Sequence, residues 1–65
     1  MKYTDFDWKA ILGNQAWTAK ELAEKLNIKL PTLRRYLRLA EVYGHLEVRK
    51  RGKVKYYAIP EGERT

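Results

Sequence analysis

Three arginines, Arg34, Arg35 and Arg38, lie close together in the middle of the 65-residue chain. A guanidinium group holds its N–H donors in a planar fork, which can bind a phosphate or the O6 and N7 atoms of guanine. If this segment is helical, steps of 100° per residue place all three side chains between about 100° and 200° from Leu33. No acidic residue stands four positions before any of them, so salt bridging along a solvated helix explains the cluster poorly.

A second group of cations lies between positions 49 and 55. It consists of Arg49, Lys50, Arg51, Lys53 and Lys55. Lysine-rich strand edges also occur as a protection against aggregation, and this is the ordinary alternative for the group. Five cations within seven residues repel one another, however, and phosphates would relieve that repulsion. Arg51, next to Gly52, is the best candidate for reaching a minor groove, whereas Lys55 could lie along a strand and contact nothing.

The overall charge agrees with an anionic partner. The chain has 14 Lys and Arg against 8 Asp and Glu, a formal net charge of +6, and a pI near 9.8. A pI above about 9 is typical of domains that bind nucleic acids. The excess of cations is concentrated in residues 29–55, so the positive charge belongs to one continuous stretch.

Two short helices are predicted before the arginine cluster. The first covers about residues 6–12, with Asp5 as its N-cap. The second covers residues 19–26 and begins with a capping box, in which Thr18 and Glu21 each accept a hydrogen bond from the other's backbone N–H. Both helices carry apolar residues at helical spacing and therefore have a face for a core.

The arginines fall on a third predicted helix, residues 30–43. Only residues 27–29 separate it from the second helix, Asn27 suits a left-handed C-cap, and Pro31 falls in the first turn, where its missing N–H costs nothing. Its apolar face contains Leu30, Leu33, Tyr36, Leu37 and Ala40. Leu39 and Val42 are predicted to be exposed, and they or the first helix could contact a second copy.

After this helix the apolar pattern changes to alternation, which predicts a β-hairpin with strands over about residues 45–50 and 53–59. A two-residue loop at Arg51 and Gly52 would pair Val48 with Lys55 and Leu46 with Tyr57. The side chains of Leu46, Val48, Tyr57 and Ile59 would then face the core. Pro60 ends the second strand, and residues 61–65 are predicted to be a frayed tail.

The order of these elements resembles the winged helix-turn-helix domain of bacterial, archaeal and phage transcription regulators. Residues 17–28, Trp-Thr-Ala-Lys-Glu-Leu-Ala-Glu-Lys-Leu-Asn-Ile, resemble the family's positioning helix and turn. Residues 33–37 resemble the core of its recognition helix, and residues 44–46 and 56–59 resemble the strands beside its wing. The chain departs from the family at Asn27 and Lys29, where many members have Gly and Ser. The resemblance implies a single α+β winged-helix domain over residues 1–65.

The resemblance also implies a DNA-binding site, for which the sequence offers two groups of residues. The recognition-helix group is Lys29, Thr32, Arg34, Arg35 and Arg38. The wing group is Arg49, Lys50, Arg51, Lys53 and Lys55, and Thr18 would support contacts to the DNA backbone. Arg34 and Arg35, nearer the N-terminal half of the helix, are better candidates for reading bases than Arg38.

Double-stranded DNA is therefore the expected partner, and transcription regulation is the expected role. Two alternatives remain open: a protein-interaction module that docks an acidic partner, and an architectural accessory of recombination or replication. A homodimer on DNA or a protein partner is possible, because one small module buries little DNA surface.

Several other classes of protein are not expected. The chain has no Cys, one His and no set of residues typical of catalysis, so we expect no enzyme activity, no metal and no cofactor. We also expect no small-molecule ligand. The absence of cysteine and of a long apolar run favours a cytoplasmic protein associated with the nucleoid, with no membrane partner.

Overall fold

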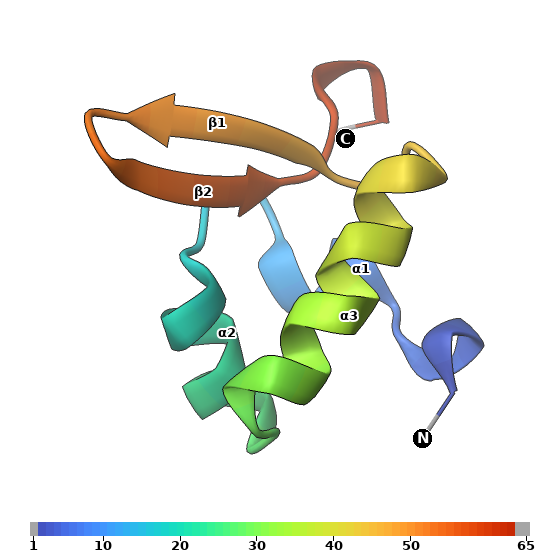
Figure 1. Ribbon diagram of the computed structural model, residues 1–65. Helices are drawn as coiled ribbons and strands as arrows, with labels where there is room; N and C mark the ends of the chain where they lie inside the picture. The colour runs from blue at the N-terminus through green and yellow to red at the C-terminus, as the bar shows by residue number, and fades with distance from the viewer. Residues whose placement is uncertain (1, 64–65) are drawn as a thin grey trace.

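The computed structural model describes residues 2–63 and shows three helices followed by an antiparallel hairpin (Figure 1). The elements are η1 (Tyr3–Asp5), α1 (Trp8–Leu12), α2 (Ala19–Leu26), α3 (Leu30–Val42), β1 (Glu47–Arg51), β2 (Val54–Ala58) and η2 (Glu61–Glu63). The hairpin lies across one end of the helices, and α3 runs past α2 in front of α1 in the view of Figure 1. The α+β class and the order of the elements are confirmed.

Helix α1 begins two residues later than predicted, and Asp7 rather than Asp5 caps it. The carboxylate of Asp7 accepts a hydrogen bond from the backbone N–H of Ala10 at 3.4 Å. Asp5 instead belongs to the 3-10 turn η1. Phe6 has extended backbone angles, and its ring stacks on that of Trp8 with centroids 4.8 Å apart. The helix does not include Phe6, because the backbone of Phe6 is extended and Asp7 is the N-cap.

Helix α2 has the predicted bounds, and its capping box is confirmed. The hydroxyl of Thr18 accepts from the Glu21 N–H at 3.1 Å, and the Glu21 carboxylate accepts from the Thr18 N–H at 2.9 Å. Asn27 adopts the left-handed conformation, with φ 54°, and ends the helix. The predicted turn of residues 27–29 is also confirmed, because α3 begins at Leu30.

The hairpin is shifted relative to the predicted register. Lys50 pairs with Lys55 and Val48 with Tyr57, so the two-residue loop consists of Gly52 and Lys53 and not of Arg51 and Gly52. Gly52 has φ 66°, which suits the first loop position of a type II′ turn. Strand β1 begins two residues later and ends one residue later than predicted, and β2 lies within its predicted range. The predicted core side is retained: Leu46 and Ile59 are buried, and Val48 and Tyr57 are half-buried.

A backbone bridge that the sequence does not reveal fixes the hairpin to the segment before α2. Trp17 donates its N–H to the Tyr57 carbonyl at 2.9 Å, and Tyr57 donates to the Trp17 carbonyl at 2.7 Å. The Trp17 indole N–H also donates to the Leu12 carbonyl at 3.0 Å. One residue therefore links α1, the start of α2 and strand β2.

The core lies between the three helices and the inner side of the hairpin. It contains Trp8, Leu12, Leu22, Ala23, Leu33, Leu37, Ala40, Leu46 and Ile59. Leu33, Leu37 and Ala40 have no exposed surface, which confirms the predicted apolar face of α3. The arginines of α3 are consequently held on a helix whose opposite side is fully packed.

Residues 61–63, which the sequence assigns to a frayed tail, form the turn η2, and residues 64–65 of that predicted tail lie outside the described residues. None of the helices in the described part of the chain is both long enough and apolar enough to cross a membrane.

Candidate nucleic-acid interface

Helix α3 presents a cationic face opposite its buried side. Arg34, Arg35 and Arg38 are all exposed, while the neighbouring Leu33 and Leu37 are buried. No described carboxylate lies within ion-pair distance of any of the three guanidinium groups. Their N–H donors are therefore available to an external anion.

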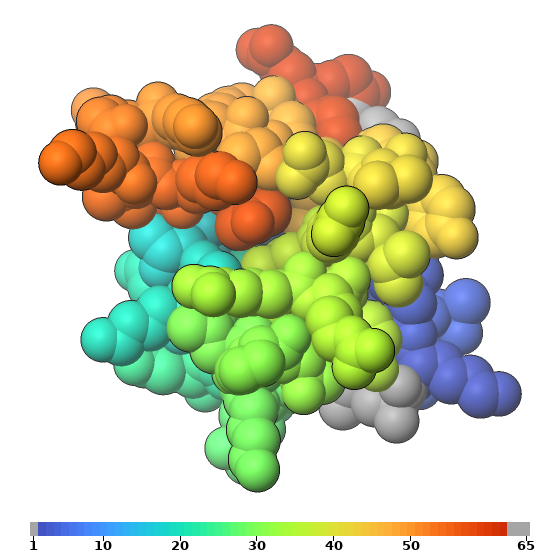
Figure 2. Space-filling view, viewed as in Figure 1, coloured from blue at the N-terminus to red at the C-terminus, as the bar shows by residue number. Residues whose placement is uncertain are grey.

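A groove of about 850 Å³ runs between α3 and the hairpin. Its lining residues are Ala19, Lys20, Leu30, Arg34, Arg38, Glu41, Val42, Lys53, Val54, Lys55 and Tyr57. Five of these side chains are cationic and one is a carboxylate, so the groove attracts anions. Figure 2 shows the hollow between the orange hairpin and the green α3, with the teal α2 beside it.

The structure brings together only part of the predicted site. Arg34 and Arg38 of α3 line the groove together with Lys53 and Lys55 of the hairpin. Arg35 is exposed about 100° further around the helix from Arg34, outside the groove lining. The two arms of the predicted interface thus meet in one place, although they are separated in the sequence by Gly44 and the whole of β1.

The remaining members of the helix group lie at the N-terminal end of α3. Lys29 is the N-cap residue and Thr32 lies in the first turn, and both side chains are exposed. Thr18 lies at the corresponding end of α2, where its hydroxyl oxygen is occupied by the Glu21 N–H. That hydroxyl can still donate its own hydrogen, so a backbone contact from Thr18 stays a prediction.

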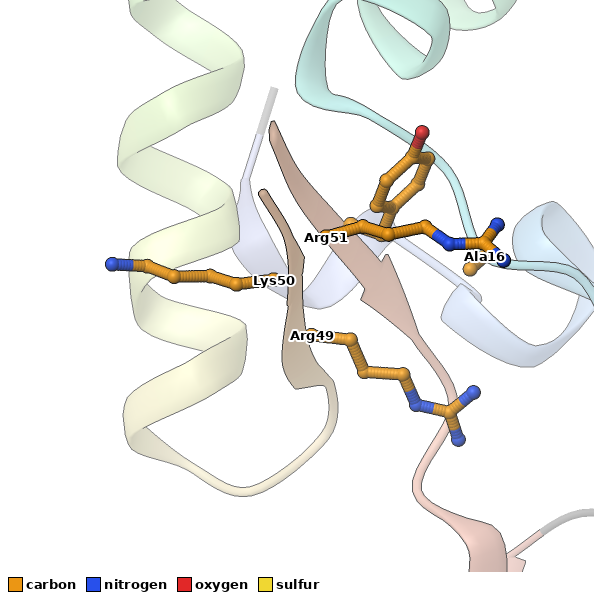
Figure 3. Close-up of a pocket in the computed structure, with 5 residues that line it drawn as sticks. Ala16, Arg49, Lys50 and Arg51 are labelled. Atoms are coloured by element: carbon orange, nitrogen blue, oxygen red, sulfur yellow. The ribbon is translucent and has the colours of Figure 1, made fainter. Parts of the chain in front are cut away.

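The hairpin cations divide between the two sides of the sheet. Arg49 and Arg51 extend to one side of β1 and Lys50 extends to the other (Figure 3). Arg49 donates to the carboxylate of Glu47 at 2.8 Å, and both side chains are substantially exposed. Arg49 and Arg51 do not line the groove beside α3. The predicted wing group is therefore divided: Arg49 and Arg51 lie on one side of the hairpin, whereas Lys53 and Lys55 line the groove.

Tyr57 forms part of the groove where α3 and the hairpin meet. Burial raises the pKa of its phenol, the carboxylate of Glu41 raises it further, and Arg34 acts in the opposite direction. The phenol is therefore protonated at neutral pH and can donate a hydrogen bond to an anion in the groove.

Sequence reasoning missed Lys20 and Glu41 as groove residues. Lys20 lies in the first turn of α2, and Glu41 follows Arg38 by three positions on α3. The spacing of Glu41 from Arg38 was a usable signal, because residues three apart share a helix face. The sequence contains no comparable signal for Lys20, because the position of Lys20 beside the hairpin depends on the bridge between Trp17 and Tyr57.

Within residues 2–63, no group of three or more His, Asp or Glu side chains is arranged to hold a metal ion. Comparison of the chain with protein-family models, curated proteins and solved structures finds no match.

Proposed function

We propose that this protein binds double-stranded DNA as a winged helix-turn-helix domain and acts as a small transcription regulator of a prokaryote or phage. Helix α3 is the recognition helix in the major groove, and the hairpin is the wing against the adjoining backbone or minor groove. The observation that carries the proposal is the groove lined by Arg34 and Arg38 of α3 on one side and by Lys53 and Lys55 of the hairpin on the other.

The dimensions of α3 support this placement. Its 13 residues give a length of about 20 Å at 1.5 Å per residue, and an α-helix with its side chains is about 10–12 Å across. The major groove of B-DNA is about 12 Å wide. Arg34, Arg35 and Arg38 can thus reach guanine edges or phosphates while the packed side of the helix stays against the core.

Apolar side chains on the same side of α3 suit base contacts as well. Val42 is 72% exposed and Leu39 is 38% exposed, and helical steps place both on the outer side with Arg35 and Arg38. The 5-methyl group of thymine is the apolar feature of the major groove. We assign Leu39 and Val42 to thymine contacts.

The lysines of the wing serve a different purpose. Lys53 lies in the hairpin loop and Lys55 is the second residue of β2, and their flexible ammonium groups can follow the phosphate backbone without reading sequence. One module of this size buries only about 600–1,000 Å² on DNA, so a second copy or partner on an adjacent half-site would be needed for high specificity.

Fluorescence anisotropy with a random duplex, titrated from 50 to 200 mM salt, tests the proposal. Affinity should fall by about 10²–10³-fold, as expected for roughly five phosphate contacts, and the corresponding single strand should bind more weakly. The Lys53→Ala/Lys55→Ala variant should reduce the salt slope by about 2. Lys2→Ala/Lys9→Ala removes the same charge from exposed positions outside the groove and should leave the slope unchanged.

The arginines of α3 give the complementary test. Arg34→Ala should weaken duplex binding by about 1–3 kcal/mol and leave the melting temperature unchanged, because the side chain is exposed and unpaired among the described residues. Negligible duplex binding by the wild type at 50 mM salt would contradict the proposal and favour an acidic protein partner.

A further inference from the structure

The outer face of the hairpin carries cations that the DNA groove does not use. Arg49 and Arg51 lie two positions apart on β1, so both side chains leave the same side of the strand. Tyr56 is the cross-strand partner of Arg49 and therefore shares that face. The proposed recognition groove lies on the other side, against α3, and is lined by none of these three residues.

These residues line a shallow pocket of about 400 Å³. Its lining is completed by Ala16, from the segment before α2, and by Lys50. Figure 3 shows the guanidinium group of Arg51 extending over the sheet toward Ala16, and that of Arg49 extending from the same side of the strand. Two guanidinium forks and a phenol hydroxyl therefore border one depression, and all three can donate hydrogen bonds to phosphate oxygens.

Glu47 reduces the positive charge of this face but leaves hydrogen-bond donors of Arg49 available. Its carboxylate accepts from one terminal nitrogen of Arg49 at 2.8 Å, and the pair is exposed to water. A guanidinium has five N–H donors, so other donors of Arg49 stay available for a phosphate. Arg51 has no ion-pair partner among the described side chains.

A single straight duplex cannot easily contact both faces of the hairpin. The minor groove of B-DNA is about 6 Å wide, whereas a sheet with side chains on both faces occupies a layer of about 10 Å. When α3 lies in the major groove and the lysines of the wing contact the adjoining DNA backbone, Arg49 and Arg51 point away from that duplex. A phosphate bound by these arginines would belong to a different DNA segment.

We propose that Arg49, Arg51 and Tyr56 form a second phosphate-binding site, through which one protein molecule holds a second DNA duplex beside the one in the groove. This inference rests on the proposed function, because it takes the groove beside α3 as the first DNA site. The consequence is bridging of two duplexes, an activity that the recognition helix alone does not provide.

A capture experiment tests the second site. A duplex is immobilised, loaded with the 65-residue protein at 50 mM salt, and exposed to a fluorescent duplex of the same length. The wild type should retain the fluorescent duplex. Raising the salt to 200 mM should weaken this retention about tenfold more than it weakens binding of the protein to the immobilised duplex, as expected for two additional phosphate contacts. Arg49→Ala/Arg51→Ala should abolish retention and change single-duplex affinity by less than threefold. Glu47→Gln should increase retention, because it releases Arg49.

A control variant and the contrary results separate the second site from the groove. Lys2→Ala/Lys9→Ala loses the same two charges away from both faces and should retain the second duplex as the wild type does. The inference is overturned if the wild type binds one duplex but captures no second. It is also overturned if the arginine variant bridges normally, or loses single-duplex affinity as steeply as Lys53→Ala/Lys55→Ala. Failure of the wild type to bind any duplex would instead refute the proposed function.

Discussion

Helix α3 and the hairpin both present cations to the same groove, but they hold them in different ways. The arginines of α3 project from a helix whose Leu33, Leu37 and Ala40 are completely buried. The strand residues nearest the hairpin tip are exposed on both β1 and β2, and the hairpin is anchored at its other end. A rigid base suits the reading of fixed base edges, whereas a mobile ammonium suits phosphates, which carry no sequence information.

The largest effect should come from removing the support of α3. Leu33→Ala leaves a cavity at a site with no exposed surface and should lower the free energy of unfolding by about 2–5 kcal/mol, measured by urea denaturation. Val54→Ala, at the exposed end of β2, should change it by about 0.5 kcal/mol or less. Equal losses in the two variants would show that the hairpin tip supports the fold as strongly as the helix does.

The same contrast explains which elements could be predicted from the sequence. The bounds of α2 are determined by Thr18, Glu21 and Asn27, all of which act on their immediate neighbours. The start of α1 was missed because the aromatic packing of Phe6 involves Trp8 and also Tyr36, far along the chain. Local capping signals are readable in a sequence, whereas packing between distant residues is not.

The hairpin register shows the same limit. A glycine can occupy either position of a two-residue loop, so Gly52 alone did not distinguish the predicted pairing from the observed one. The bridge between Trp17 and Tyr57 joins residues forty positions apart and has no local signature. The exposed arginines of α3 were predictable from periodicity, but the meeting of Lys20 with the hairpin lysines was not.

A smaller effect should separate base reading by α3 from phosphate binding by the hairpin. Replacing thymine by uracil in a bound duplex removes only the 5-methyl group from the major groove. At positions contacted by Leu39 or Val42, this change should weaken binding by about 0.8 kcal/mol per methyl lost, measured by anisotropy at constant salt. The Leu39→Ala/Val42→Ala variant should bind both duplexes nearly equally. Equal binding of both duplexes by the wild type would remove Leu39 and Val42 from the interface while leaving the groove proposal intact.

The smallest effect concerns Tyr57, where α3 and the hairpin meet. Its phenol has a pKa raised above the ordinary value of 10.0, because burial and the Glu41 carboxylate disfavour the ionised form. The folded state therefore holds this proton more tightly than the unfolded state does. Below pH 10 both states are protonated and the stabilisation is fully present. As the pH rises above 10 the unfolded state ionises first, and the stabilisation is lost through the folded pKa.

Comparing the wild type with Tyr57→Phe isolates this contribution, because the lysines titrate alike in both proteins. The free energy of unfolding of the wild type, relative to the variant, should fall between pH 9 and pH 11.5 in urea denaturation. Glu41→Gln removes one cause of the raised pKa, so the same comparison in that background should show a smaller fall. If the difference in unfolding free energy between the wild type and Tyr57→Phe did not change with pH, the pKa of the phenol would be the same in the folded and unfolded states. Tyr57 would then be solvated like the hairpin tip and would not belong to the packed side of the groove.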